Sequence, residues 1–165
     1  IGWCDWSSDV CSSDLKATLC PKEEMGEVLL YSKANASNAT AASTLLIDNV
    51  GLLNTLYRYG HVAYIGGGLG KGIHNTLEPA AFGLPVIFGP KYEKFEEARQ
   101  FVARGGAFVV HNAAELKALL HQFKDPVFYE NAYRAVLTYL EESRGATHLI
   151  LAFFQRHIKT GKIIG

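Results

Sequence analysis

The most informative stretch of the sequence for the fold is VAYIGGGLGKGIHNTLEPAAFGLPVIFG, residues 62–89. It begins with the apolar run Val62–Ile65, continues through a glycine-rich loop, and ends with a second apolar run, Pro85–Phe88. Between these runs, residues 75–82 have the composition of a short helix that Gly83 closes. A buried strand, a loop, a helix and a second buried strand make up a βαβ unit, which is typical of a parallel sheet.

The same alternation continues on both sides of this unit. Apolar runs at 28–31, 44–47 and 107–110 predict further strands. Helical spacing predicts helices at 50–59, 94–104 and 113–123, and Asp125-Pro126 opens a run of helices that extends to about residue 157. We therefore predict an α/β fold with a Rossmann-like, doubly wound parallel sheet, formed by a single domain over 16–165, and a helical C-terminal tail.

The composition fits a soluble globular domain. The 165 residues are 48% hydrophobic and carry 16 basic and 16 acidic residues, which argues against a disordered chain. Three Cys are too few for a disulfide scaffold, and no apolar run reaches the roughly 20 residues that a membrane span needs. The balanced charge gives no electrostatic basis for binding nucleic acid, so we expect no nucleic-acid partner.

The first fifteen residues, IGWCDWSSDVCSSDL, differ from the rest. They hold both Trp and two of the three Cys of the chain. Residues 5–15 match the translation of a common sequencing-library adapter, so we expect 1–15 to be an artefactual, disordered leader and the chain to be a fragment. This leader contains three of the 16 acidic residues and none of the 16 basic ones, so the remainder is mildly basic.

The glycine loop is where we expect a ligand to bind. In parallel α/β sheets, ligands bind beyond the carboxyl ends of the strands, where a loop leads into a helix. Glycines let the backbone approach a ligand closely, the start of a helix favours an anion, and a carboxylate accepts hydrogen bonds from ribose hydroxyls. The candidate nucleotide-binding residues are Gly66, Gly67, Gly68, Lys71, His74, Asn75 and Glu78.

Two familiar nucleotide motifs do not fit this loop. The dinucleotide fingerprint has Lys71 or Ile73 where its third glycine should be. A P-loop would need glycine at Ile65 and a hydroxyl residue at Gly72.

The candidates also have structural explanations. Asn75 followed three residues later by Glu78 is the pattern of a capping box, in which the two side chains satisfy backbone N–H groups at a helix start. His74 can be a structural histidine, and Lys71 can be either a solvated charge or a phosphate partner. The histidines at 111, 121, 148 and 157 show no spacing typical of a metal site, so we predict no metal.

Motifs spread over much of the chain resemble one family. They read Asp48-Asn-Val-Gly51-Leu-Leu, Ala63-Tyr-Ile-Gly66-Gly67-Gly68, His74-Asn75-Thr-Leu-Glu78-Pro79-Ala80 and Gly83-Leu-Pro85-Val-Ile-Phe88-Gly89-Pro90. Over residues 26–157 the chain resembles the C-terminal half of the 3-deoxy-D-manno-octulosonic acid (Kdo) transferases of lipopolysaccharide synthesis, most closely those of Bacteroidetes. The His-Asn-x-x-Glu-Pro-Ala block joined to Gly-x-Pro-Val-x-Phe-Gly-Pro is specific to that family.

The resemblance implies a GT-B glycosyltransferase whose C-terminal half binds the donor CMP-Kdo. It implies inverting transfer of Kdo to a lipid A precursor, without metal or cofactor, at the cytoplasmic face of the bacterial inner membrane. The acceptor site, the catalytic base and the membrane anchor would lie in a missing N-terminal half. We therefore assign no catalytic residue here and expect this fragment to be soluble but inactive alone.

Carried over to this sequence, the resemblance places Gly66–Gly68 against the nucleotide and Asn75 and Glu78 in contact with CMP. Two positions depart from the pattern of many members. Ile73 stands where a second glycine precedes the histidine, and Leu52 stands where many members have Glu.

Two other functions stay open from the residues alone. The first is a GT-B transferase or epimerase that uses a UDP-sugar, since the glycine loop and Glu78 would serve either nucleotide. The second is a free-standing nucleotide-binding module without catalysis, for which Met25, the only Met, would be the start.

Overall fold

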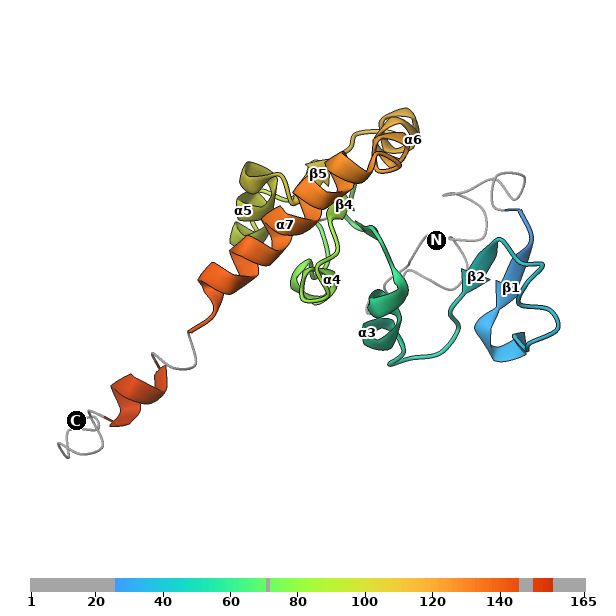
Figure 1. The fold of residues 1–165 in the computed structure, drawn as a ribbon, viewed down its shortest axis with the longest axis horizontal. Coiled ribbons are helices and arrows are strands. Elements are labelled where there is room, and N and C mark those ends of the chain that lie inside the picture. The colour runs from blue at the N-terminus through green and yellow to red at the C-terminus, as the bar shows by residue number, and fades with distance from the viewer. Residues whose placement is uncertain (1–25, 71, 146–149, 156–165) are drawn as a thin grey trace.

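The structure is a computed structural model that describes residues 26–70, 72–145 and 150–155 (Figure 1). The adapter-like leader 1–15, Met25 and Lys71 lie outside these residues. Within the described part, short strands and helices alternate along the chain, as the sequence predicts.

The first two strands form a sheet of their own. β1 (Val28–Leu30) and β2 (Thr44–Leu46) pair in parallel, and the 3-10 helix η1 (Tyr31–Lys33) follows β1. Asp48, just beyond β2, accepts hydrogen bonds from the Ser32 hydroxyl (2.5 Å) and the Ser32 backbone N–H (2.9 Å). These two hydrogen bonds lower the pKa of the Asp48 carboxyl below its usual range, and the bond from the Ser32 hydroxyl has the larger effect. They also connect the end of β2 to η1.

The other strands form a three-stranded parallel sheet. Its order is β3 (Ala63–Ile65), β4 (Val86–Phe88) and β5 (Ala107–Val109). All three residues of the central strand β4 are fully buried, as expected for a parallel strand covered on both faces. The predicted α/β class with parallel strands is confirmed, and the described strands are divided between this sheet and the β1–β2 pair.

Helices connect and cover the strands. The helix predicted at 50–59 begins only at Leu53, because Gly51 has a φ of +90°, which is incompatible with a right-handed helix; Val50 before it is 95% exposed. The described helices are α3 (Leu53–Leu56), which continues into the 3-10 helix η2 (Tyr57–Tyr59), α4 (Leu77–Ala80), α5 (Glu96–Arg104), α6 (Ala113–Gln122) and α7 (Pro126–Ser143).

Side-chain caps fix the starts of the two longest helices. Asn112 accepts a hydrogen bond from the Glu115 backbone N–H (2.9 Å), and the Glu115 carboxylate accepts one from the His111 backbone N–H (2.8 Å), so α6 begins with a reciprocal cap. Asp125 accepts a hydrogen bond from the Val127 N–H (3.0 Å), with Pro at the first helical position of α7. Asp125-Pro126 is therefore the helix start that the sequence predicts.

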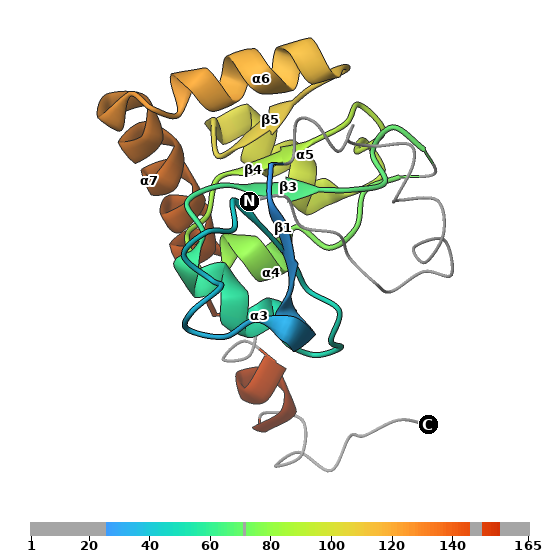
Figure 2. The same cartoon turned by 90° about the vertical axis from the view of Figure 1, so that its right-hand side faces the viewer.

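Helix α7 lies beside α5 (Figure 1) and also packs against α4 (Figure 2). The core between these helices contains Phe101 and Val136, both fully buried. The ring of Phe101 lies 4.5 Å from that of Tyr139, measured between centroids. At the surface, Arg104 of α5 pairs with Glu142 of α7 (2.5 Å).

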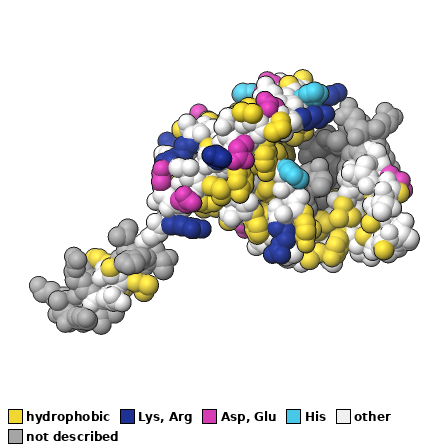
Figure 3. Space-filling view, in the orientation of Figure 1, with side chains coloured by type: hydrophobic (Ala, Val, Ile, Leu, Met, Phe, Trp, Pro, Cys, Tyr) yellow, Lys and Arg dark blue, Asp and Glu magenta, His cyan; other side chains and the backbone are white. Residues whose placement is uncertain are grey.

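The predicted helical tail is confirmed over residues 150–155, which follow α7 and extend away from the sheet (Figure 1). Apolar side chains lie on its surface (Figure 3): Ile150, Leu151, Phe153 and Phe154 are each at least half exposed. Among the described residues, no helix is both long and apolar enough to cross a bilayer.

Candidate functional site

The three parallel strands end at one edge of their sheet. The register pairs Ile65 with Phe88 and Phe88 with Val109, so the loops that follow β3, β4 and β5 leave the sheet side by side. This is the edge at which parallel α/β sheets bind ligands. The glycine loop follows β3 and therefore starts at this edge, as predicted from the sequence.

The glycine loop folds back on itself. The Gly67 carbonyl accepts hydrogen bonds from the N–H groups of Gly70 (2.8 Å) and Gly72 (3.2 Å). The Gly66 carbonyl accepts one from the His74 N–H (3.3 Å), which brings the end of the loop back to its start. Gly67 has a φ of +86°, and a Cβ there would lie 2.2 Å from the Gly72 carbonyl oxygen, so only glycine fits.

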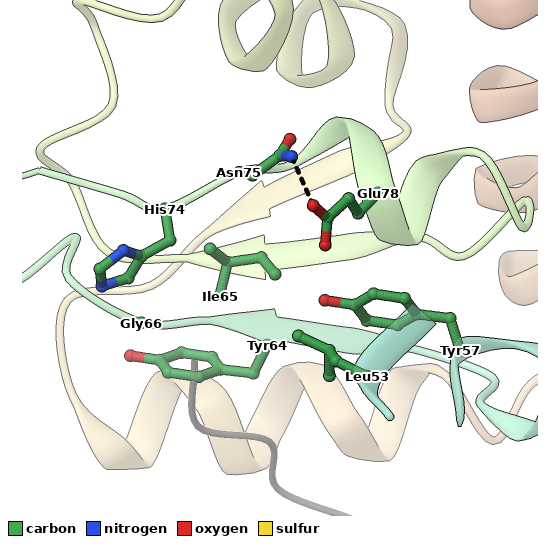
Figure 4. A pocket seen from close by; sticks show the side chains of 8 residues that line it. All are labelled: Leu53, Tyr57, Tyr64, Ile65, Gly66, His74, Asn75 and Glu78. Carbon is green, nitrogen blue, oxygen red and sulfur yellow. Dashed lines mark hydrogen bonds between the residues drawn. The ribbon is translucent and has the colours of Figure 1, made fainter. Parts of the chain in front are cut away.

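Asn75 and Glu78 meet at the start of α4. The Asn75 side-chain oxygen accepts a hydrogen bond from the Leu77 N–H (2.9 Å), and its amide nitrogen donates to the Glu78 carboxylate (3.0 Å) (Figure 4). Asn75 therefore caps the first N–H of α4, as the structural explanation predicts, but from one residue before the N-cap position, which Thr76 occupies without a side-chain cap bond of its own. The capping box is incomplete, because Glu78 accepts from the Asn75 side chain rather than from its backbone N–H.

Helix α4 is shorter than the predicted 75–82. It spans four residues, after which the chain turns, with the Leu84 N–H donating to the Pro79 carbonyl (3.2 Å). Gly83, with a φ of +78°, takes the left-handed conformation that commonly follows the end of a helix, and its N–H donates to the Ala80 carbonyl (2.7 Å). A helix of one turn has a small dipole, so its attraction for an anion is weaker than the sequence suggests.

A hollow opens between the start of α4, the end of β3 and helix α3 (Figure 4). Its volume, including the part open to solvent, is about 320 Å³. The residues that line it are Leu53, Tyr57, Tyr64, Ile65, Gly66, His74, Asn75 and Glu78. One wall is apolar and aromatic, and the opposite wall carries a carboxylate, an amide and an imidazole.

Four of the predicted site residues line this hollow: Gly66, His74, Asn75 and Glu78. His74 and Glu78 are half-buried, and Asn75 is exposed. Gly67 and Gly68 shape the loop but are not among the lining residues.

Sequence reasoning did not assign the wall opposite Glu78. Leu53 and Tyr57 lie four residues apart in the helix predicted at 50–59, so their shared face was foreseeable. Such a pair is usually core, and Tyr57 is indeed 4% exposed. Among residues 26–70, 72–145 and 150–155, no three His, Cys, Asp or Glu side chains gather as a metal site would require.

One buried polar atom beside this site has no partner. Thr76, between Asn75 and Leu77, is 1% exposed, and its hydroxyl makes no hydrogen bond within the described part of the chain. A buried hydroxyl without a hydrogen-bond partner costs free energy, so the Thr76 hydroxyl destabilises the folded state at the start of α4.

Comparison with known proteins agrees with the resemblance seen in the sequence. No protein-family model matches the chain. It is 37% identical over 106 residues to the 3-deoxy-D-manno-octulosonic acid transferase of Aquifex aeolicus, covering 61% of this chain and 30% of that protein. It is 34% identical over 122 residues to the enzyme of the same name from Haemophilus influenzae, covering 70% of this chain and 28% of that protein.

A solved structure shares the fold. The crystal structure of the C-terminal CMP-Kdo binding domain of WaaA from Acinetobacter baumannii aligns with a TM-score of 0.62 and 23% identity, covering 69% of this chain and 61% of that one. The chain spans about a third of the length of the curated relatives it matches. The predicted resemblance is thus confirmed: this chain is a relative of part of the 3-deoxy-D-manno-octulosonic acid (Kdo) transferases.

Proposed function

We propose that this chain is the donor-binding domain of a Kdo transferase and that the hollow beside Gly66 and Glu78 receives the nucleotide of CMP-Kdo. The observation that carries this proposal is the Glu78 carboxylate, which the Asn75 amide holds at the mouth of a hollow that begins at the carboxyl end of β3. The names of the relatives and the shared fold support CMP-Kdo as the donor.

In this proposal Glu78 binds the ribose. A carboxylate has about four acceptor positions, so the hydrogen bond from Asn75 leaves capacity for the two ribose hydroxyls. Only about 20 Å³ of the hollow is enclosed, and the rest is open to solvent. The ligand would therefore lie across the open hollow, with its ribose beside Glu78 and the sugar extending outward.

The glycine loop is the proposed neighbour of the phosphate. Gly67 and Gly70 are exposed and carry no side chain, so a phosphate can approach the loop backbone closely. His74 lies at the same end of the hollow as Gly66 (Figure 4) and would contact the same part of the ligand. Lys71, within the loop, is the candidate cation for the phosphate.

The chain holds the donor in this proposal, and we assign it no catalytic base, metal or cofactor. The acceptor, a lipid A precursor, and the base would be bound by another part of the enzyme at the cytoplasmic face of the inner membrane. Inverting transfer then depends on how firmly this domain orients the CMP leaving group, because positioning supplies much of the acceleration in such reactions.

Calorimetric titration of the purified chain with CMP, UMP and a UDP-sugar tests the proposal. We expect CMP to bind at least about tenfold more tightly than either uridine ligand, a difference of about 1.4 kcal/mol. Tighter binding of the UDP-sugar would instead identify a different GT-B transferase or epimerase. Failure of all three ligands to bind would refute the assignment of a nucleotide site.

A further inference from the structure

Two glycines from different loops are in direct backbone contact beside the candidate site. Gly68 lies in the loop after β3 and Gly89 follows β4, and both are buried. A Cβ built on Gly68 would lie 2.6 Å from the Gly89 backbone nitrogen, and one built on Gly89 would lie 2.6 Å from the Gly68 carbonyl carbon. The neighbouring Lys91 N–H donates a hydrogen bond to the Gly68 carbonyl (2.9 Å).

Steric contact is the reason for glycine at both positions. Neither residue has the positive φ that disfavours other residues, so alanine would meet no backbone strain at either one. The atoms that a methyl group would strike are main-chain atoms, which cannot rotate away as a flexible side chain can. A methyl group at either glycine must therefore push the two loops apart.

The contact is connected to the hollow through the glycine loop itself. Gly68 is two residues from Gly66, which lines the hollow, and the loop between Gly66 and His74 is closed by its own hydrogen bonds. Displacing Gly68 away from Gly89 would therefore move the backbone that forms one side of the hollow. Neither Gly68 nor Gly89 lines the hollow.

We propose that Gly68 and Gly89 are positioning residues for the nucleotide. Their contact holds the loop after β3 against the loop after β4, and so fixes Gly66 and His74 where a ligand can meet them. This inference rests on the proposed function. It goes beyond that function by assigning the affinity of the site partly to a contact that the ligand does not touch.

The test compares Gly68→Ala, Gly89→Ala, the double variant and Gly106→Ala in the 165-residue chain. Gly106 is the matched control: a Cβ there would also make a close contact, 2.9 Å from the Val136 Cγ2 atom, without a positive φ, but it lies just before β5 and outside both loops. Each variant is titrated with CMP at a temperature at which circular dichroism shows it folded. The melting temperature is recorded separately.

We expect each single variant at 68 or 89 to bind CMP about tenfold or more weakly, and Gly106→Ala to stay within about twofold of wild type even if its melting temperature falls. Because both glycines act through one contact, the double variant should lose little more than either single variant, whereas independent sites would add. Lower melting temperatures with unchanged CMP affinity would overturn the inference. So would additive losses in affinity.

A measurement on the wild type covers the case in which the variants do not fold. Hydrogen exchange of the Lys91 amide, which lies outside the hollow, should slow about tenfold when CMP is saturating, because the ligand stabilises the joined loops. An unchanged Lys91 exchange rate while CMP binds would overturn this inference and leave the proposed function intact. If the wild type does not bind CMP at all, the proposed function and this inference fail together.

Discussion

Replacing Asn75 and Glu78 separately distinguishes a nucleotide site from a helix cap, because the structure gives the two residues different tasks. Asn75 accepts the Leu77 N–H (2.9 Å) and so supports the start of α4. Glu78 accepts a hydrogen bond from the Asn75 amide (3.0 Å) and faces the hollow (Figure 4). Asn75→Ala should therefore act mainly on stability, and Glu78→Ala mainly on nucleotide binding.

The magnitudes follow from these contacts. Loss of the cap at Asn75 should cost about 1 kcal/mol of stability, a fall of about 2–4 °C in melting temperature for a domain of this size. Glu78→Ala removes the hydrogen bond between the Glu78 carboxylate and the exposed Asn75 side chain, and this loss should cost less than about 0.5 kcal/mol of stability. It also removes a charged acceptor for the ribose, worth about 1–3 kcal/mol, so CMP should bind about 5–150 times more weakly.

Thermal denaturation and calorimetric titration on the same preparations measure both quantities. Glu78→Gln serves as a control, since it keeps an oxygen for the Asn75 amide but loses the charge, and should fall between wild type and Glu78→Ala in CMP affinity. If Glu78→Ala lowers the melting temperature by several degrees and leaves CMP affinity unchanged, Glu78 is part of a helix cap and the ribose assignment is wrong.

Three further predictions concern stability. Phe101→Ala should lower the free energy of unfolding, measured in urea, by about 3–5 kcal/mol because Phe101 is fully buried. Phe154→Ala is the control: this side chain is half exposed, so its loss should change the free energy of unfolding by less than about 0.5 kcal/mol. Equal effects of the two changes would contradict the packing of α5 on α7. Thr76→Val removes a buried hydroxyl without a partner and should raise the free energy of unfolding by about 1 kcal/mol, whereas a clear loss would mean that the hydroxyl is bonded. Ser32→Ala should raise the pKa of Asp48, followed by carboxyl NMR, because the hydroxyl bond that lowers it is lost. Since the folded-state pKa of Asp48 is depressed, its stabilising effect is present above the unfolded pKa and is lost as pH falls through the folded value, and Ser32→Ala should weaken this acid dependence.

Local elements were predictable from the sequence because their signals are local. Pro85–Phe88 is a short apolar run rich in β-branched residues, and β4 lies within it. Asp125-Pro126 combines a cap residue with a proline at the first helical position, and α7 starts there. The position of the glycine loop at the carboxyl end of β3 followed from the same βαβ reasoning.

Features that depend on contacts between distant residues were not predictable. Nothing local in the strand sequences indicates that β1 and β2 pair apart from β3, β4 and β5. The glycine pattern drew attention to Gly68 as a neighbour of the ligand, but its contact with Gly89 joins residues on either side of α4. The apolar wall of the hollow was not predictable either. Tyr57 has the sequence context of a core residue, and that context is the same whether or not the side chain also lines a hollow.

The most direct test of the central claim is to map CMP binding residue by residue on the ¹⁵N-labelled chain by NMR. The proposed site predicts that the largest shift changes fall on the amides of Gly66, His74, Asn75 and Glu78, which line the hollow. Smaller changes are expected at Gly89 and Lys91 through the contact between the loops. Saturable CMP binding with its largest changes elsewhere, for example around Asp48 and the β1–β2 pair, would contradict the assignment of this hollow as the nucleotide site.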